Sequence, residues 1–181
     1  MEIRPLKLAG TYEIRFAPQR DVRGYFMRTY DEVIFARFGL ATSWVHESQS
    51  LSLQRGTLRG LHFQKPPYAE TKLVQVVAGA VFDVFVDLRR NSATYGQWDS
   101  IELSSQAHIA VYIPKGCAHG FYTLTAETLI FYKMDARYIA DLQDGIIWND
   151  ATLKINWPTS APIISDRDRR FGTFANLVSP F

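Results

Sequence analysis

Two short stretches of the sequence each place one histidine on an apolar, strand-like segment: Leu58-Arg59-Gly60-Leu61-His62-Phe63-Gln64 and Pro114-Lys115-Gly116-Cys117-Ala118-His119-Gly120-Phe121. A β-strand sends alternate side chains to opposite faces. If the two strands belong to one small barrel, His62 and His119 can therefore point into the same interior from different walls. That interior is the candidate functional site.

The length and charge of the chain limit the classes of protein to consider. A chain of 181 residues suits one domain with a sizeable core, so we expect residues 1–181 to form a single domain. The 20 Lys and Arg residues nearly balance the 18 Asp and Glu residues, and the net charge is only +2. Basic residues form no cluster of the kind that favours nucleic acid or anionic membranes. We therefore expect neither nucleic acid nor membrane as a partner.

No part of the sequence is typical of a targeting or membrane-spanning segment. No long apolar run follows Met1 to Pro5, and the most apolar later stretch, Val81 to Leu88, is short and contains two aspartates. The single cysteine, Cys117, excludes an internal disulfide framework, which fits a reducing compartment. These features favour a soluble, cytoplasmic protein.

Short segments rich in β-branched, aromatic and alternating residues follow one another along the chain, with turn residues between them. The expected strands are Thr11 to Phe16, Trp44 to Ser52, Thr57 to Gln64, Lys72 to Val77, Val81 to Leu88, Trp98 to Leu103, His108 to Ile113, Phe121 to Leu124 and Thr128 to Lys133. One helix is expected from Asp31 to Phe38, ended by Gly39, with further short helices beyond Asp141. Many short strands at this spacing indicate an all-β sandwich or barrel.

The pattern Gly60-x-His62 followed by Pro114-x-Gly116-x-x-His119-Gly120 resembles the two motifs of the cupin superfamily. Cupins are double-sheet jelly rolls, or double-stranded β-helices, whose small barrel holds a ligand or a metal. In metal-binding cupins the first motif usually supplies two histidines two positions apart and a carboxylate. Here the second of those positions is Gln64, and Glu70 is the nearby carboxylate. Because metals are usually held by three or more protein groups, we expect no metal, and side chains must then supply the acid and base.

A series of motifs in a fixed order narrows the resemblance to one family. They are Asp21-x-Arg23-Gly24-x-Phe26, Gly56 to Gln64, Lys72-Leu73-Val74, Asp83-Val84-x-Val86-Asp87-Leu88-Arg89, Ile113 to Phe121, and Gly145-Ile146-x-Trp148-Asn149-Asp150. From about Asp21 to Asp168 the chain resembles the dTDP-4-dehydrorhamnose 3,5-epimerase family. The resemblance implies a homodimeric isomerase that needs no cofactor and serves deoxysugar or polysaccharide biosynthesis. Its reaction would be epimerisation, at C3, C5 or both, of a 4-keto-6-deoxy sugar linked to a nucleotide diphosphate.

The implied reaction needs a base and an acid on opposite faces of the sugar. The ketone acidifies the hydrogens on C3 and C5, because the carbanion left by deprotonation delocalises onto oxygen as an enolate. The resemblance assigns His62 as the base, Asp168 as the carboxylate that holds the other ring nitrogen, and Tyr132 as the acid. Lys72 would stabilise the negative charge on the enolate oxygen. Taken alone, each of these residues is more often an ordinary core or solvent-exposed side chain.

Further residues are expected to bind the substrate. Arg59 lies two positions before His62, shares its strand face, and can contact pyrophosphate through two N–H groups. The resemblance implies that His119 contacts the sugar or the enolate and that Tyr138 packs at the mouth of the site. Arg167 stands where the family usually has a lysine.

The resemblance also implies that Arg23 and Phe26 act in the site of the partner subunit, because in this family an amino-terminal strand crosses to the neighbouring barrel. Several other positions near the substrate depart from the family pattern. Arg28 and Gln143 replace glutamates, and His46 and Ser48 replace a Gln-x-Asn pair. These replacements change charge and hydrogen-bonding capacity, so the epimerase chemistry is more firmly indicated than the nucleotide or the sugar.

Three alternatives stay open. The chain can be a single-position epimerase that inverts C3 or C5 on a different nucleotide sugar. It can be a metal-dependent cupin enzyme, an oxygenase or a sugar isomerase, with His62, His119 and Glu70 as ligands. It can also be a barrel that binds a sugar nucleotide without turnover.

Overall fold

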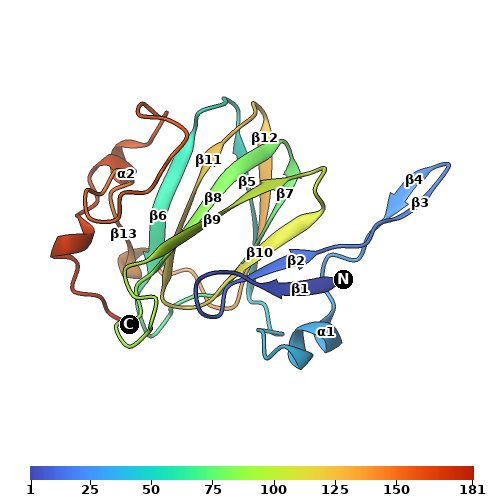
Figure 1. The fold of residues 1–181 in the computed structure, drawn as a ribbon, viewed down its shortest axis with the longest axis horizontal. Helices are drawn as coiled ribbons and strands as arrows, with labels where there is room; N and C mark the ends of the chain where they lie inside the picture. The colour runs from blue at the N-terminus through green and yellow to red at the C-terminus, as the bar shows by residue number, and fades with distance from the viewer.

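Two antiparallel sheets form a barrel in the computed structural model, which describes residues 1–181 (Figure 1). The six-stranded sheet has the strand order β1-β2-β10-β7-β12-β5, and the five-stranded sheet has the order β13-β6-β11-β8-β9. The first sheet contains β1 (Glu2–Pro5), β2 (Tyr12–Arg15), β10 (Ile109–Ile113), β7 (Lys72–Ala78), β12 (Thr128–Met134) and β5 (His46–Ser52). The second contains β13 (Gln143–Gly145), β6 (Leu58–Gln64), β11 (Cys117–Thr123), β8 (Ala80–Asp87) and β9 (Trp98–Ser104). The expected all-β jelly-roll barrel is confirmed.

A cluster of 12 buried side chains fills the space between the two sheets. Alternate residues of the strands supply it, such as Val74 and Val76 of β7, and Phe85 of β8 packs with Ile130 of β12. Burying one such side chain contributes about 1.5–3 kcal/mol. Tyr132, two residues after Ile130, packs partly buried against the cluster. The hydrophobic core therefore supports Tyr132 from one side.

The helix α1 (Glu32–Arg37) covers the outer face of the six-stranded sheet. Its one buried residue, Phe35, packs with Leu73 of β7 and Tyr112 of β10. The side chain of Asp31 caps the first turn, and Gly39 follows the last turn with a positive φ of 67°. The predicted helix is confirmed.

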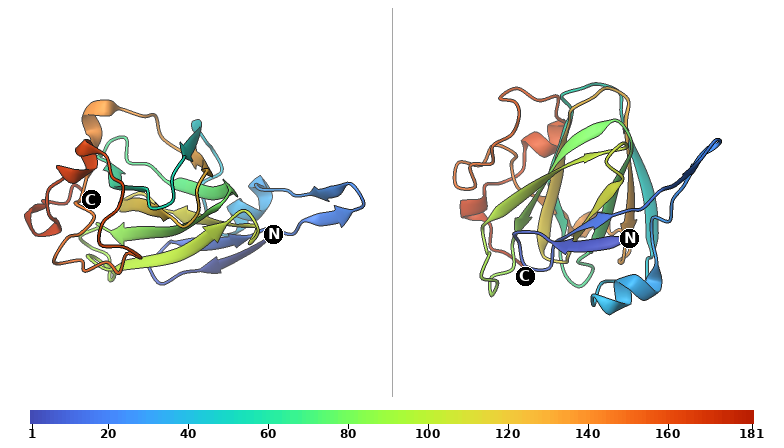
Figure 2. Two further views of the ribbon diagram at one scale, coloured as in Figure 1. Left: turned by 90° about the horizontal axis from the view of Figure 1, so that it is seen from above. Right: turned by 45° about the vertical axis from the view of Figure 1, so that its right-hand side comes forward.

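A hairpin of β3 (Gln19–Asp21) and β4 (Gly24–Phe26) extends away from the barrel (Figures 1 and 2). All residues of both strands are exposed, and Phe26 has 71% of its surface accessible. Phe26 stands opposite Gln19 at the base of the hairpin, and Val22 in the turn and Tyr25 in β4 are exposed as well. The hairpin therefore presents apolar surface away from the barrel.

The carboxy-terminal segment lies at the opposite end of the molecule from the hairpin, against β6 and β13 (Figures 1 and 2). It contains α2 (Asp166–Arg169) and the 3-10 helix η2 (Phe174–Asn176), and η1 (Ala140–Leu142) precedes β13. α2 and η2 confirm the short helices expected beyond Asp141, whereas η1 begins one residue before it. Backbone hydrogen bonds join Ile163 to both Gly56 and Leu58, each at 2.8 Å. The segment is thus fixed beside β6, the strand that carries His62.

The predicted strands correspond to β2 and to β5 through β12, and all but one agree within two residues at each end. The exception is β11, which begins at Cys117, four residues before the predicted start. Its first residues have little β-propensity, but they pair with β8, as Cys117 does with Asp87. The short strands β1, β3, β4 and β13 were not predicted. No helix in the structure is long and apolar enough to cross a membrane.

Candidate active site

The two histidine motifs form neighbouring strands, β6 and β11, in which His62 and His119 are paired in register. The strands approach closely at two glycines. A Cβ atom on Gly60 would lie 2.5 Å from Cα of Gly120, and one on Gly120 would lie 2.8 Å from the carbonyl oxygen of Arg59. Only glycine fits at both positions, so the sequence of the motifs sets how closely the two histidines approach.

Both histidines line one hollow in the barrel, with a volume of about 280 Å³. Its lining comprises Ser48, Gln49, Ser50, Arg59, His62, Lys72, His119, Phe121 and Tyr132. A second hollow of about 450 Å³ adjoins it and shares Arg59 and His62. This one is bounded by the carboxy-terminal segment through Ile163 to Ser165, Arg167 and Asp168. Together they make a cleft with His62 at its centre.

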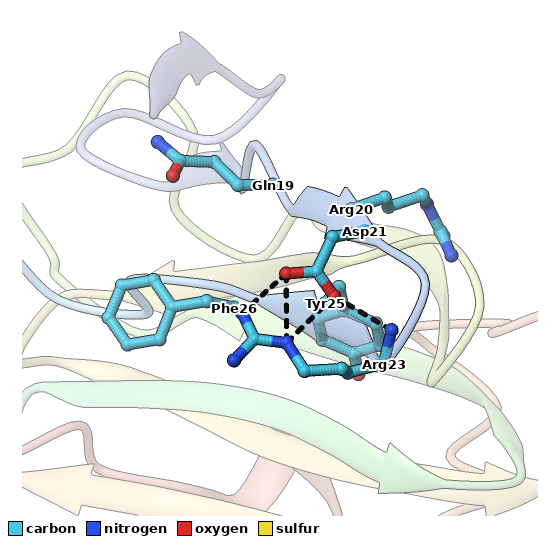
Figure 3. A pocket seen from close by; sticks show the side chains of 6 residues that line it. All are labelled: Gln19, Arg20, Asp21, Arg23, Tyr25 and Phe26. Carbon is cyan, nitrogen blue, oxygen red and sulfur yellow. Dashed lines mark hydrogen bonds and ion pairs between the residues drawn. The ribbon is translucent and has the colours of Figure 1, made fainter.

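The largest hollow, about 520 Å³, lies on the hairpin and not in the barrel (Figure 3). In Figure 3 the side chains of Arg23 and Asp21 are joined by hydrogen bonds, the shortest 2.5 Å long. Exposed side chains of the hairpin line this hollow, and none of the residues proposed for proton transfer is among them. Within one chain, the structure therefore does not bring Arg23 and Phe26 to the cleft.

His62 and Asp168 form a hydrogen-bonded pair, as the resemblance implied. Nε2 of His62 lies 2.8 Å from Oδ1 of Asp168, and the backbone N–H of Gly60 donates to Oδ2 at 3.0 Å. The hydroxyl of Ser165 caps α2 by accepting from the backbone N–H of Asp168 at 3.1 Å. An ionised Asp168 accepts the Nε2 proton, and Nδ1 of His62 is then the nitrogen with a free lone pair.

The surroundings keep this pair in the state that a base requires. Burial lowers the pKa of His62, and the hydrogen bond to Asp168 opposes that effect without cancelling it. Burial tends to raise the pKa of Asp168, but the hydrogen bonds from His62 and Gly60 outweigh it and hold the pKa below the usual value. At neutral pH the pair is therefore a carboxylate and a neutral imidazole.

Tyr132 reaches the same hollow from β12, in the opposite sheet. Burial raises the pKa of its hydroxyl. The phenol is therefore protonated throughout the physiological range and can donate a proton. A neutral imidazole and a protonated phenol on strands of opposite sheets, both lining one hollow, are a base and an acid that can act on one bound molecule.

Lys72 brings a positive charge to the hollow from the start of β7. Its ammonium nitrogen lies 3.2 Å from Oε1 of Glu70, and both side chains are largely buried. Glu70 is thus engaged with lysine and not with the histidines. No group of three or more His, Cys, Asp or Glu side chains has the geometry to hold a metal ion. The metal-dependent alternative gains no support from this arrangement.

Gln64, which stands at the position of a metal-binding histidine in other cupins, has a structural role. Its amide nitrogen donates to the carbonyls of Tyr68 and Arg137, and its oxygen accepts from the backbone N–H of Ile139 at 2.7 Å. The fully hydrogen-bonded amide joins two loops at one end of β6.

Two arginines lie along the cleft. Arg59 lines both hollows and donates to the Ser52 hydroxyl at 3.3 Å. Arg167 donates to Oε1 of Gln143 at 3.0 Å, and its guanidinium lies 5.9 Å from the centre of the Phe171 ring. Neither arginine is paired with a carboxylate, so both can bind an anion.

The remaining predicted site residues are distributed unevenly. Ser48 lines the hollow and is paired in register with Tyr132. His46, the first residue of β5, pairs with Met134 and lines neither hollow. Tyr138 is exposed in the segment between β12 and η1 and does not line the cleft either. Arg28 pairs with Asp31 at the start of α1. The structure therefore does not bring His46, Tyr138 or Arg28 into the cleft of its own chain.

Two contacts were missed from the sequence. Nε2 of His119 lies 2.8 Å from Oδ2 of Asp83, which is fully buried. The ring of Phe171 packs edge-on against His62, with 5.6 Å between ring centres. A signal for the first existed, because an aspartate inside an apolar strand requires a buried partner. Nothing in the sequence pattern indicates the second.

Comparison with known proteins places these observations in context. Residues 5–176 match the family model described as dTDP-4-dehydrorhamnose 3,5-epimerase. A dTDP-4-dehydrorhamnose 3,5-epimerase of Sinorhizobium fredii is 43% identical over 182 residues, covering 100% of this chain and 93% of the relative. A dTDP-4-dehydrorhamnose 3-epimerase of Streptomyces niveus is 38% identical over 170 residues, covering 93% and 82%.

The fold is also similar to solved structures of such enzymes. The crystal structure of dTDP-4-dehydrorhamnose 3,5-epimerase from Bacillus anthracis, which has TDP and PPi bound, superposes with a TM-score of 0.92 at 41% identity. The match covers 95% of this chain and 98% of the other.

Proposed function

Because this chain belongs to the dTDP-4-dehydrorhamnose 3,5-epimerase family, we propose that His62 and Tyr132 carry the proton transfers by which it epimerises its sugar. The protein is an isomerase that acts on a nucleotide-linked 4-keto-6-deoxy sugar. The observation that carries the mechanistic proposal is the 2.8 Å His62–Asp168 pair lining the same cleft as Tyr132.

The first step is removal of a proton from a carbon next to the ketone. Nδ1 of neutral His62 takes the proton, and the electron pair of the C–H bond moves into the enolate. Asp168 stabilises the imidazolium that forms. The ammonium of Lys72 stabilises the charge that develops on the enolate oxygen.

The second step is return of a proton to the other face of the same carbon. The phenol of Tyr132 supplies it, the enolate collapses to the ketone, and the carbon is inverted. The resulting imidazolium and phenolate return to their starting states by proton exchange with water. No oxidant or reductant is needed, because the substrate and the product are isomers.

Arg59 and Arg167 are proposed to bind the pyrophosphate. The family acts on dTDP-linked sugars, and the two arginines line the same hollow as His62 and have no carboxylate partner. We expect Arg59→Lys to raise KM more than it lowers kcat, because lysine keeps the charge but loses the two-pronged contact.

Incubation with dTDP-linked 4-keto-6-deoxy sugar in heavy water tests this function. NMR should show deuterium entering C3, C5 or both with the wild-type protein, and His62→Ala or Asp168→Asn should slow its entry by about 10²–10⁴-fold. Asp144→Asn, a carboxylate on β13 outside the cleft, is the matched control and should exchange at the wild-type rate. Absence of exchange with every nucleotide form in a panel would overturn the enzyme proposal.

The same spectra decide how many centres invert. The Streptomyces niveus relative is named as a 3-epimerase, whereas the Sinorhizobium fredii relative is named as a 3,5-epimerase. We propose inversion at both C3 and C5 for this chain. A product inverted at one carbon alone would reassign it to the single-position class.

We further propose a homodimer in which each hairpin reaches the cleft of the other subunit. The hairpin projects away from its own barrel and bears the exposed Phe26 and Arg23, which the cleft of its own chain does not use (Figure 2). The edge strand β5 is also exposed along most of its length and has unpaired backbone groups on one side. A partner segment would cover both features.

A further inference from the structure

A second histidine–carboxylate pair lies in the wall of the cleft, besides that of His62. Asp83 is on β8 and His119 on the neighbouring β11, at diagonal positions of the register in which Phe121 stands opposite Asp83 (Figure 1). Diagonal side chains of paired strands point to the same face. Their contact, 2.8 Å between Nε2 and Oδ2, is almost fully excluded from solvent.

Asp83 lies behind the wall of the cleft and not in it. His119 lines the hollow, whereas Asp83 has no accessible surface and does not line it. Its other oxygen, Oδ1, is buried without any hydrogen-bond partner. Asp83 can therefore act on a bound sugar only through His119.

The proton content of this pair determines what His119 offers the substrate. With one proton shared between carboxylate and imidazole, the proton lies between Asp83 and Nε2, Nδ1 is a bare lone pair, and the pair carries a net negative charge. With two protons the pair is neutral overall. One proton lies between Oδ2 and Nε2, and the second is on Nδ1, because a proton on the buried Oδ1 of Asp83 would have no acceptor.

Burial favours the two-proton form. A net negative charge at a fully buried carboxylate with one orphaned oxygen is strongly disfavoured. Burial accordingly raises the pKa of Asp83, against the influence of His119 and Lys72. The positive charge that could offset a net anion is Lys72, but Glu70 lies 3.2 Å from its ammonium and already compensates it.

Other polar side chains that line the hollow with His119 come from β5, β6 and β12, and those of β5 are Ser48, Gln49 and Ser50. Paired with it in register is His62 of β6, neutral at the working pH, and the Tyr132 ring of β12 lies edge-on with 6.4 Å between ring centres. Arg59 of β6 lines the same hollow and is positively charged. In the structure none of these groups hydrogen-bonds to His119, whose one side-chain hydrogen bond joins it to Asp83, so Nδ1 is left for an oxygen of a bound sugar.

We propose that Asp83 is a positioning residue that keeps His119 in the form whose Nδ1–H donates a hydrogen bond to an oxygen of the bound keto sugar. We identify that oxygen as the ketone oxygen, which becomes the enolate oxygen, and this identification rests on the proposed function. His119 is then a second electrostatic stabiliser beside Lys72, and its contribution is larger in the enolate than in the ketone.

The first test needs no catalysis. ¹⁵N NMR of wild-type protein labelled at histidine, with His119 assigned by the spectrum of His119→Asn, reads which ring nitrogens carry protons at pH 7. We expect a protonated Nδ1. An unprotonated Nδ1 would overturn the inference even if the enzyme is fully active. A protonated Nδ1 would support the inference about the Asp83–His119 pair even if the protein turns over no keto sugar.

The second test separates positioning from structure. An asparagine amide nitrogen can replace Nδ1–H, so His119→Asn should keep kcat within about tenfold, whereas His119→Ala should lose about 10²–10³-fold. Asp83→Asn should lower kcat by about tenfold or more with a smaller change in KM. In a protein that already carries His119→Ala, adding Asp83→Asn should cause no further loss of kcat.

The matched control is Asp87→Asn, which alters an equally buried aspartate on the same strand. Asp87 accepts from Arg89, Ser92 and Thr94 away from the cleft. Its replacement should lower the melting temperature but leave kcat and the His119 spectrum unchanged. Equal kcat losses for His119→Asn and His119→Ala, an unaltered kcat in Asp83→Asn, or an additional loss in the double variant would each contradict the proposal.

Discussion

At the scale of single residues, the proposed chemistry depends on burial, which lowers the pKa of His62 and raises the pKa of Tyr132. Burial disfavours the charged form of any side chain. It therefore keeps His62 neutral and able to accept a proton, and keeps Tyr132 neutral and able to donate one. The same hollow thus contains a neutral imidazole and a protonated phenol, the two states that the proposed base and acid require.

A pH profile of kcat/KM tests this residue-level account. Because the pKa of His62 is lowered, activity should fall only below its usual value of about 6.5, where the imidazole becomes protonated. Because the pKa of Tyr132 is raised, the basic limb should lie above the usual value of about 10. We expect a plateau between these limits. An acid limb centred above pH 7 would contradict the assignment of a buried, neutral His62.

At the scale of elements, the close approach of β6 and β11 places the two histidines together. Gly60 and Gly120 permit that approach, and the pairing shifts register just after His119. The carboxy-terminal segment then brings Asp168 back to β6 over more than 100 positions of sequence. The site is therefore assembled by strand pairing and one returning segment.

Gly120→Ala tests the importance of that approach. The added Cβ would lie 2.8 Å from the Arg59 carbonyl oxygen and 3.1 Å from Cα of Gly60, so the strands must separate. We expect a loss of about 1–3 kcal/mol in the free energy of unfolding, measured by urea denaturation. Gly172→Ala is the control, since its Cβ would meet nothing within 4 Å and should change stability little. Equal effects of the two substitutions would argue against a tight contact.

Alternation and turn residues in the sequence were enough to predict most strands and the helix. They failed where pairing overrides propensity, as at Cys117 to Gly120, and for the short strands β1, β3, β4 and β13. His62 and His119 were expected to share an interior if their strands belonged to one small barrel, because alternate side chains of a strand point to opposite faces. The partner of His119 could not be predicted, because the register that sets Asp83 beside it is a property of the folded sheet. The catalytic roles of His62, Tyr132, Asp168 and Lys72 stay predictions.

At the scale of the whole molecule, the chain has a site at one end and a projecting arm at the other. The arm carries Arg23 and Phe26 away from the cleft of its own barrel (Figures 1 and 3). In a symmetric dimer, each arm is available to the other subunit. The complete substrate site would then consist of one barrel and the arm of its partner.

Mixed dimers test the exchange of arms. One variant, His62→Ala, lacks the base but has an intact arm, and the other, Arg23→Ala with Phe26→Ala, has the base but a defective arm. Co-refolding or co-expression of equal amounts gives half of the dimers as mixed dimers. If each arm acts on the partner, every mixed dimer has one intact site, so about one site in four should have normal KM. If arms act on their own barrel, mixing restores nothing. Activity of the separate variants, assayed at the same concentration, is the baseline.

The central claim is that one side chain removes the proton and another, on the opposite face, returns it. Tyr132→Phe separates these events most directly, followed by NMR in heavy water. Since His62 is intact, the variant should exchange the hydrogen at C3 or C5 for deuterium but return it to the original face, giving labelled substrate with little inverted product. Loss of exchange and inversion together in Tyr132→Phe, or inversion at the wild-type rate, would contradict the account.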